Sequence, residues 1–170
     1  GIGDFECECG AMFEGPLCQC ELFPSTEVDY TNDGTFTQAM LYDLPPGVSV
    51  TGSNTINVLN LNGLGIVGGN NNNTVDGNEW IQFAFDYPSL STQYFVTSAG
   101  NIDLDGFVGE AVIEAFDEAD VSLGMVMVND SGPKNLDALY PGARITRFRV
   151  TAMVDSFRVG SVSVSPLVCM

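Results

Sequence analysis

Short runs of alternating apolar and polar residues, separated by Gly, Pro, Asn and Asp, constrain the fold of this 170-residue chain more than any other feature. In residues 79–86, for example, Ile81, Phe83 and Phe85 fall on one face of an extended strand, and Gln82 falls on the other. Such alternation predicts half-buried strands, and the turn residues between the runs predict tight connections. We therefore predict an all-β protein built from short antiparallel strands.

Similar runs recur along most of the chain. We expect strands at residues 35–42, 47–51, 54–61, 79–86, 92–98, 109–117, 121–129, 143–154 and 156–164. The valines of the last run change phase, and a β-bulge near Gly160 would restore the alternation. We expect helical structure only as a short turn within residues 134–140. Strands of this length and spacing predict an antiparallel sandwich of two sheets with aromatic residues facing inward.

The composition argues against several classes of function. The chain has 22 acidic and five basic residues and no histidine, which gives a formal net charge of −17. Without histidine there is no Ser-His-Asp triad, no Cys-His pair and no imidazole acid or base. So few basic residues argue against a nucleic-acid-binding surface, and no apolar run approaches the roughly 18 residues that a membrane helix needs. We predict a non-catalytic protein without nucleic acid or a transmembrane segment.

The charges are also unevenly distributed along the chain. Residues 1–133 hold 20 acids and no base, whereas residues 134–170 hold two acids and all five bases. One interpretation is that a late basic strand lies beside acidic strands within one sandwich. The other is that the basic surface of one copy meets the acidic surface of the next, in a heterologous contact that can build a filament.

Four of the five cysteines cluster near the beginning of the sequence. The five are Cys7, Cys9, Cys18, Cys20 and Cys169. Two close thiolate pairs could hold zinc or an iron–sulfur cluster, but a CxC spacing suits zinc less well than CxxC does. A disulfide-stapled segment in an oxidising compartment fits better, because so short a segment has no core of its own. The odd count leaves Cys169 either to close back onto the cluster or to bond a neighbouring copy.

The motif Cys7-x-Cys9-Gly-Ala-Met-Phe-Glu-Gly-Pro-Leu-Cys18 resembles the second half of an EGF-like repeat, in which CxC precedes an aromatic residue, a glycine and a closing cysteine. The resemblance implies secretion and an extension that is stapled by disulfides. We expect this extension at residues 1–22, a polar linker at residues 23–34 and the main β-domain at residues 35–170.

Four stretches between residues 48 and 164 carry a second resemblance. They are NTINVLNLNGLGIVGG, GNEWIQFAFD, SAGNIDLDGFVGEAVIEAFDEADVSLG and ITRFRVTAMVDSFRVGSVSV. Together they resemble the galactose-binding-like jelly-roll domains of secreted bacterial proteins. The resemblance implies a jelly-roll order of strands, and in many members a glycan site at one end and a structural calcium ion. Other members only adhere or assemble, so the fold does not decide the function.

A glycine-rich stretch formally matches the dinucleotide fingerprint GxGxxG. It runs Gly63-Leu-Gly65-Ile-Val-Gly68 and is followed by a glycine and four asparagines. The fingerprint needs a helix at this point, whose N-terminus receives the pyrophosphate. The asparagines do not begin such a helix, so we interpret the stretch as a glycine–asparagine loop rather than a nucleotide site.

The best ligand-like motif is Asn101-Ile-Asp103-Leu-Asp105-Gly106. Alternating oxygen side chains followed by a glycine suit calcium, which takes six to eight oxygen ligands. The alternative is a solvated acidic turn with Asx hydrogen bonds. Residues that could complete a calcium shell are Glu110, Asp76 and Glu79. A second calcium candidate pairs Glu27, Asp29 or Asp33 with Asp155, where the resembled fold places its ion.

Aromatic residues and arginines supply the candidate binding groups. Trp80 is the only tryptophan and either packs in the sandwich or stacks on a sugar. The tyrosines near predicted loops, which could also face a sugar, are Tyr87, Tyr94 and Tyr140. The arginines that could grip a carboxylate or a sulfated sugar, or pair with acids on adjacent strands, are Arg144, Arg147, Arg149 and Arg158.

The sequence thus predicts a secreted, non-catalytic jelly-roll sandwich with a disulfide-stapled extension. We expect it to self-associate as a structural or adhesive protein, as a filament or a surface-assembly subunit, through Cys169 and the four arginines. The alternative is a calcium-dependent carbohydrate-binding module that uses Trp80 and the loop tyrosines.

Overall fold

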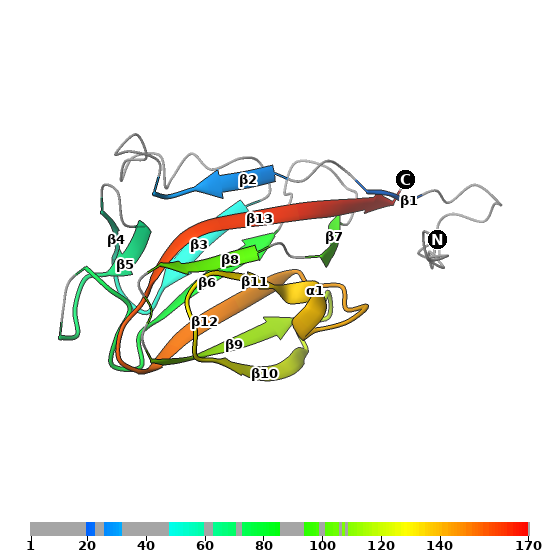
Figure 1. Cartoon of the computed structure of the whole chain (residues 1–170). Helices are drawn as coiled ribbons and strands as arrows, with labels where there is room; N and C mark the ends of the chain where they lie inside the picture. Colours follow the sequence, from blue (N-terminus) through cyan, green and yellow to red (C-terminus); the bar gives the residue numbers. More distant parts are fainter. Residues whose placement is uncertain are drawn as a thin grey trace.

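A computed structural model describes residues 20–22, 26–31, 48–59, 63–70, 73–85, 94–98, 101–105, 107 and 109–169. These residues form two antiparallel β-sheets that pack against each other (Figure 1). The prediction of an all-β sandwich is confirmed at this level. The expected strand at residues 35–42 lies outside the described residues, as do Cys7, Cys9, Cys18 and Tyr87.

The smaller sheet has five strands in the order β10-β9-β12-β6-β3. Their bounds are β3 Val48–Gly52, β6 Trp80–Phe85, β9 Glu110–Phe116, β10 Ser122–Val128 and β12 Arg147–Val154. In its centre Val150 of β12 lies opposite Ile81 on one side and Ile113 on the other. All three are fully buried, because alternate residues of these strands face the second sheet. The strands expected from alternation in this part of the chain are thus confirmed.

The larger sheet has eight strands and is organised around β13. The bounds are β1 Cys20–Leu22, β2 Thr26–Asp29, β4 Ile56–Leu59, β5 Gly63–Ile66, β7 Tyr94–Ser98, β8 Asn101–Asp105, β11 Pro133–Asn135 and β13 Arg158–Cys169. Val162 of β13 lies opposite both Val28 and Ile102, and Val168 lies opposite both Glu21 and Tyr94. β13 therefore has β2 and β1 along one side and β8 and β7 along the other.

The bulge expected near Gly160 is present. The register between β13 and β8 shifts between Val159 and Val162. The shift lets Val159, Val162 and Val164 all point inward although they do not share one phase of the alternation. β13 is therefore one continuous strand, although its alternation of apolar and polar residues shifts by one position near Gly160.

The glycine-rich stretch expected as a loop instead contains the buried strand β5. Every residue of β5 is buried, and Ile66 also bridges to Thr74. A Cβ atom on Gly65 would lie 2.5 Å from the carbonyl oxygen of Asn73, so only glycine allows this backbone approach. The glycines that suggested a flexible loop therefore serve close packing between backbones.

Four other strands also lie where none was expected. β1 falls within the expected extension, β2 within the expected linker, β8 coincides with the expected calcium loop, and β11 precedes the short helix. Each is short, and β2, β8 and β11 are rich in polar residues, so local alternation is a weak predictor there. Their backbone groups are satisfied by pairing with β13 or, for β11, with β8.

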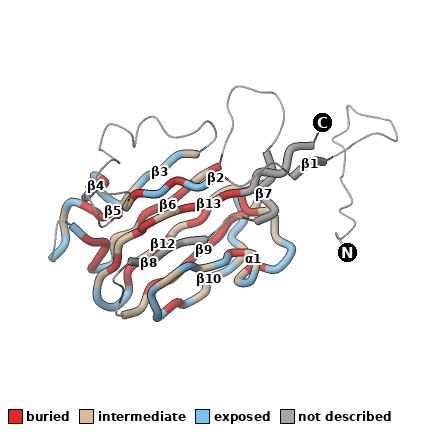
Figure 2. Tube along the Cα trace, turned by 45° about the horizontal axis from the view of Figure 1, so that its top comes forward, coloured by how far each residue is buried: buried red, intermediate tan, exposed pale blue. Residues whose placement is uncertain are grey.

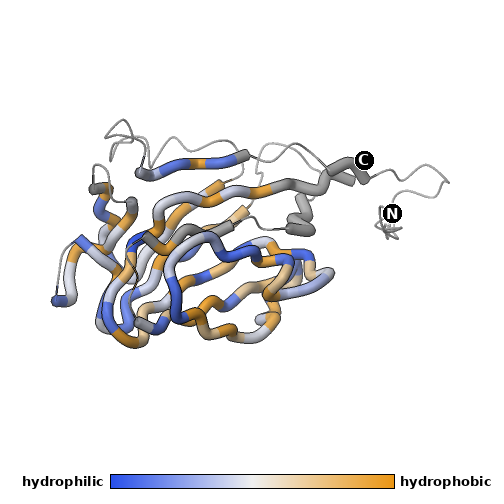
Figure 3. Tube along the Cα trace, viewed as in Figure 1, coloured by the Kyte–Doolittle hydropathy of each residue, from blue (hydrophilic) through white to orange (hydrophobic). Residues whose placement is uncertain are grey.

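Buried and hydrophobic residues recur along the strands of both sheets (Figures 2 and 3). The core that they form between the sheets is rich in aromatic residues. Phe83 stacks on Phe148 with ring centroids 5.1 Å apart, and Tyr30, which follows β2, lies 6.2 Å from Phe83. Burial raises the pKa of Tyr30 well above its ordinary value. Phe107 packs edge-on against Phe157 at 5.9 Å. The inward-facing aromatic residues expected from the sequence are therefore confirmed.

The expected helical turn is confirmed as α1, Leu136–Leu139. Asn135 caps it, because its side-chain oxygen accepts a hydrogen bond of 2.9 Å from the backbone N–H of Asp137. Within the described part of the chain, no helix combines the length and the apolar character needed to cross a membrane.

Candidate functional site

The outer face of the five-stranded sheet carries a group of polar and aromatic side chains from three adjacent strands. The inward residues of β6 and β12 are apolar, so the residues between them point outward, as the burial pattern of each strand shows. This places an arginine pair of β12 beside β6 and the end of β9. We call the group the arginine cluster, and it consists of Trp80, Gln82, Phe116, Arg147 and Arg149.

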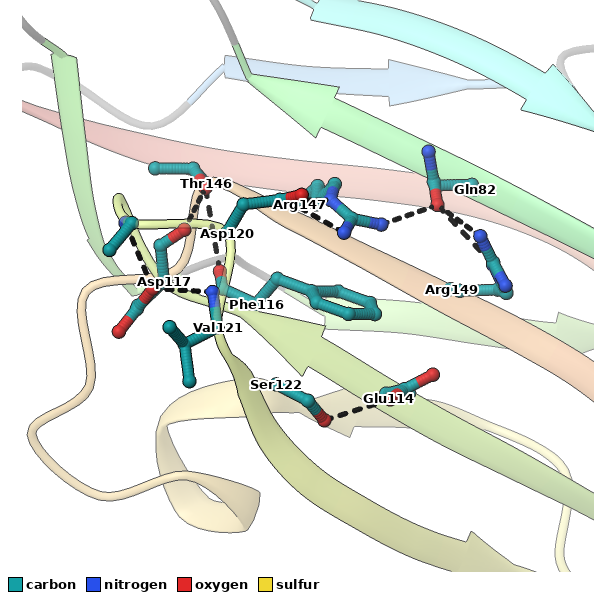
Figure 4. Close-up of polar contacts among 11 residues, drawn as sticks. Gln82, Glu114, Phe116, Asp117, Asp120, Val121, Ser122, Thr146, Arg147 and Arg149 are labelled. Atoms are coloured by element: carbon teal, nitrogen blue, oxygen red, sulfur yellow. Dashed lines mark hydrogen bonds and ion pairs between the residues drawn. The ribbon is translucent and has the colours of Figure 1, made fainter.

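One amide oxygen orients both arginines of the cluster. Gln82 Oε1 accepts hydrogen bonds from Arg147 Nη1 at 2.9 Å and from Arg149 Nη2 at 3.0 Å and Nε at 3.3 Å (Figure 4). Gln82 can do this because it lies directly opposite Arg149 in the register of β6 and β12. Two like charges are thereby held close together on the sheet.

Each guanidinium also lies over an aromatic ring. The Arg147 guanidinium carbon is 3.5 Å from the centroid of the Phe116 ring, and that of Arg149 is 4.4 Å from the Trp80 ring. The ring faces attract the cations and fix their planes against the sheet. These contacts hold the arginines in place without neutralising their charge.

The two arginines differ in their acidic partners. Arg147 forms an ion pair of 2.6 Å with Asp120, which is largely exposed at the edge of the cluster. Within the described residues, Arg149 has no carboxylate within 4 Å. Glu114 lies opposite Arg149 in register, and its carboxylate accepts a hydrogen bond of 2.8 Å from Ser122 (Figure 4). Arg149 is therefore the cation of the cluster that can take a carboxylate from a partner.

A tight turn supplies the acidic edge of the cluster. Asp117 Oδ1 accepts hydrogen bonds of 2.9 Å from the backbone N–H groups of Ala119 and Val121, and Thr146 donates one of 2.7 Å to the Asp117 carbonyl (Figure 4). These bonds fix the turn that presents Asp120. The charge pattern around the cluster is therefore built on an ordered backbone.

Two methionines extend the surface beyond the cluster. Met125 and Met127 of β10 are 69% and 59% exposed, and they lie opposite Glu114 and Val112 of β9. β10 ends the order of the described five-stranded sheet, so we call these residues the methionine edge. Exposed methionines at a sheet edge suit adaptable apolar contacts with another molecule.

The outer face of the larger sheet has a different character at β2. Glu27 and Asp29 are exposed, whereas Val28 between them is buried. They lie opposite Ser163 and Ser161 of β13. We call Glu27 and Asp29 the acidic pair. The two sheets thus present an acidic pair on one outer face and an arginine cluster on the other.

The remaining arginines expected to take part in self-association lie elsewhere. Arg144 is 3.8 Å from Glu118, next to the turn that carries Asp120. Arg158 begins β13 and donates a hydrogen bond of 3.0 Å to the carbonyl of Asn73. The structure therefore brings together only Arg147 and Arg149 of the four.

The candidate sugar-facing residues are dispersed. Trp80 lies on the outer face beneath Arg149 and is partly exposed, rather than packed between the sheets. Tyr140 is buried, and its single hydroxyl hydrogen is shared between the carbonyl oxygens of Ile113 at 2.7 Å and Gly124 at 3.2 Å. Burial raises the pKa of Tyr140 to about 12. Tyr94 begins β7. Of the two whose side chains the structure describes, Trp80 and Tyr140, Trp80 is the one that lies on the outer face.

The candidate calcium ligands whose side chains the structure describes do not gather into one site. The segment Asn101–Asp105 is strand β8 rather than a loop; in the register, Asp103 lies opposite Pro133 and Asp105 opposite Arg158. Glu110 begins β9, Asp155 lies in the turn after β12, and Asp29 accepts hydrogen bonds from Thr31. No group of three or more acidic or cysteine residues that could hold a metal ion occurs in the described ranges. Calcium binding stays a prediction, and nothing proposed below depends on it.

Two other acids considered as ligands form part of a turn. Asp76 is buried and accepts a 3.0 Å hydrogen bond from the backbone N–H of Asn70, and its own N–H donates to Glu79 at 3.1 Å. Burial raises the pKa of Glu79, and the nearby Asp76 charge raises it further, against a lowering by that hydrogen bond. These hydrogen bonds order the connection between β5 and β6, whereas the two carboxylate charges oppose each other.

Two cysteines lie within the described strands. Cys20 of β1 is directly opposite Cys169 of β13 in the antiparallel register. The termini of the sandwich are therefore adjacent in the larger sheet.

None of the family models, curated proteins or solved structures compared with the chain matches it. The EGF-like and galactose-binding-like resemblances therefore stay predictions. Function has to be inferred from the chemistry of the chain itself.

Proposed function

We propose that this chain is a secreted, non-catalytic structural or adhesive protein whose copies associate through the two outer faces of the sandwich. The observation that carries the proposal is Arg149, a partly exposed cation without a carboxylate within 4 Å among the described residues, on a face that continues into the methionine edge. The acidic pair on the other outer face supplies the complementary charge. Such a heterologous contact repeats from copy to copy and builds a filament or a surface assembly.

The spacing of the two charged groups supports this contact. Arg147 and Arg149 are alternate residues of β12, and Glu27 and Asp29 are alternate residues of β2. Alternate residues of a strand are about 7 Å apart, so the two pairs have the same spacing. Two carboxylates can then meet two guanidinium groups in one register. Charge-assisted hydrogen bonds between such groups are among the strongest that proteins form.

The net charge of −17 makes such a contact selective. Copies of a strongly acidic chain repel each other in most orientations. An orientation that places the acidic pair over the arginine cluster replaces repulsion by attraction, and the methionine edge adds apolar contact. Association is therefore restricted to one pairing of faces.

We propose the finer features of the molecule on the sequence evidence. The alternating strands and the galactose-binding-like resemblance favour a jelly-roll order for the sandwich. The cysteine cluster and the EGF-like resemblance favour a disulfide-stapled extension and an extracellular location. The absence of histidine from the sequence favours assembly over catalysis.

Charge reversal on each face tests the proposed contact by sedimentation velocity. We expect the wild-type chain to form larger species as its concentration rises. Arg149→Glu and the double variant Glu27→Lys/Asp29→Lys should each remain monomeric at concentrations at least ten times higher. Arg144→Glu makes the same charge change outside the cluster and should associate as the wild-type chain does.

Mixing the variants separates a heterologous contact from a symmetric one. Arg149→Glu retains its acidic pair and the double variant retains its arginine cluster, so an equal mixture should form complexes that neither variant forms alone. A wild-type chain that stays monomeric, or variants that assemble as the wild-type chain does, would overturn the proposal. A mixture that stays monomeric would overturn the pairing of these two faces.

A second candidate function is binding of acidic carbohydrates. It is favoured by one observation: Trp80 and Arg149 form a stacked pair beside the Gln82 amide, a combination that suits a carboxylated or sulfated sugar. An array of such glycans distinguishes the two functions. Binding that Arg149→Glu abolishes in a chain that is monomeric at all concentrations would favour carbohydrate binding over self-association.

A further inference from the structure

We infer that Cys20 and Cys169 form an intramolecular disulfide that joins β1 to the end of β13. The inference concerns a modification site and is independent of the proposed self-association. It resolves the two roles that the sequence leaves open for Cys169, closure onto the amino-terminal cluster or a bond to another copy.

The evidence is the register of the two strands. Cys20 lies directly opposite Cys169, followed by Glu21 opposite Val168 and Leu22 opposite Leu167. Residues directly opposite each other on antiparallel strands have Cα atoms about 4.5 to 5.5 Å apart. Disulfides span Cα distances of about 4.4 to 6.8 Å, so this position allows the bond without moving the backbone.

The register is set by contacts beyond β1 itself. β2 pairs with residues 161–164 of β13, and β7 pairs with residues 165–168 on its other side. Both ends of the long strand are therefore held between neighbours. A slip of one residue in β1 would separate the two cysteines and break this continuous pairing.

The chemistry is a thiol–disulfide exchange in an oxidising compartment. One cysteine thiolate attacks the disulfide of an oxidising partner, either a protein or a small-molecule disulfide, and releases one thiol from it. The thiolate of the second cysteine then attacks the mixed disulfide, which forms the Cys20–Cys169 bond and releases the second thiol. The two protons of the cysteines balance the two thiols of the reduced partner.

A Cys20–Cys169 bond places the unpaired cysteine of the five in a different part of the chain. With Cys20 and Cys169 paired, three cysteines remain, Cys7, Cys9 and Cys18. One of these three has no partner within this sequence. A covalent link to another molecule would therefore originate in residues 7–18 and not at residue 169.

Peptide mapping of the native chain without reduction tests the pairing. Combined cleavage after Glu and after Lys or Arg yields residues 15–21, which contain Cys18 and Cys20, and residues 159–170, which contain Cys169. We expect these two peptides to be linked by a disulfide. Cys7 and Cys9 fall on separate peptides, residues 7–8 and 9–14, so a link to either of them is recognised directly and overturns the inference.

Three further measurements test which two cysteines are bonded, whether both belong to one copy, and how much the bond stabilises the chain. The link should persist in Cys18→Ser and disappear in Cys20→Ser; the opposite pattern overturns the assignment to Cys20. Chains refolded from an equal mixture of ¹⁴N and ¹⁵N protein should yield linked peptides of one isotope only, and linked peptides of mixed mass would show a bond between copies. The double variant Cys20→Ser/Cys169→Ser should melt roughly 5 to 15 °C lower than the wild-type chain, and an unchanged melting temperature counts against the bond.

Discussion

At the scale of single residues, Glu79 shows how a turn made of two acids depends on pH. Burial and the charge of Asp76 raise the pKa of Glu79 above its ordinary value of 4.5. A carboxyl whose folded pKa is raised contributes stability at low pH, and that contribution is lost as the pH rises through the folded pKa. At neutral pH the ionised Glu79 therefore opposes folding.

We expect Glu79→Gln to melt at a higher temperature than the wild-type chain at pH 7. Glutamine keeps an oxygen that can accept the hydrogen bond from the Asp76 N–H but carries no charge. The difference should shrink as the pH falls through the raised folded pKa toward about 4.5, the ordinary value, and should be absent below it. Thermal denaturation between pH 3.5 and pH 8 measures it, and a destabilised variant at pH 7 would contradict the assignment.

Single residues also show what the sequence can predict about the candidate site. Arg147 and Arg149 were expected to take part in recognition, and alternation placed Gln82 on the polar face of its strand. The hydrogen bonds between them were not predictable, because they depend on which strand pairs with which. Phe116 likewise gains its role from Arg147, which is distant in sequence.

At the scale of elements, alternation predicts the longer strands with one buried face and fails for strands that are short or buried on both faces. β6, β9 and β12 alternate and were expected. β5 is buried throughout and begins with glycine, so it resembled a loop. β8 has the alternating acids of a calcium loop, but pairing with β13 and β11 makes it a strand. Tertiary pairing decides such segments more than local pattern does.

The burial of strand β5 leads to a prediction about Gly65. Alanine at Gly65 would bring its Cβ to 2.5 Å from the Asn73 carbonyl oxygen, so the strand and the following turn must separate. We expect Gly65→Ala to lower the free energy of unfolding by about 3 kcal/mol. Urea denaturation measures the loss.

Gly77→Ala is the matched control for this element. No atom lies within 4 Å of a Cβ built at Gly77, and its φ of +55° adds only the left-handed backbone cost. That cost is about 1 kcal/mol. Equal losses in the two variants would show that β5 does not need the close approach at Gly65.

At the scale of the whole molecule, the fold places acidic and basic residues on different outer faces, whereas in the sequence they only lie in different parts of the chain. The acidic pair and the arginine cluster lie on the outer faces of different sheets, so they cannot neutralise each other within one copy. Of the two arrangements that the sequence left open, one basic strand beside acidic strands and one contact between copies, the fold shows the first where Arg149 of β12 lies opposite Glu114 of β9, and the second stays a proposal. Arg147 pairs with Asp120 of the adjacent turn, while Arg149 has no carboxylate within 4 Å among the described residues.

Ionic strength distinguishes the forces that would hold such copies together. Salt screens pairs of exposed charges, and the Debye length falls from about 30 Å at 0.01 M to about 3 Å at 1 M. Screening also weakens the general repulsion among chains with a net charge of −17, so the balance between the two effects is informative.

If contacts of the arginine cluster dominate the interface, association should weaken at least tenfold between 0.05 M and 0.5 M sodium chloride, as measured by sedimentation. An interface led by the methionine edge should strengthen instead, because screening removes repulsion and leaves apolar contact intact. Met125→Ser/Met127→Ser should then abolish association, whereas in an arginine-led interface the same variant should associate and retain the salt dependence.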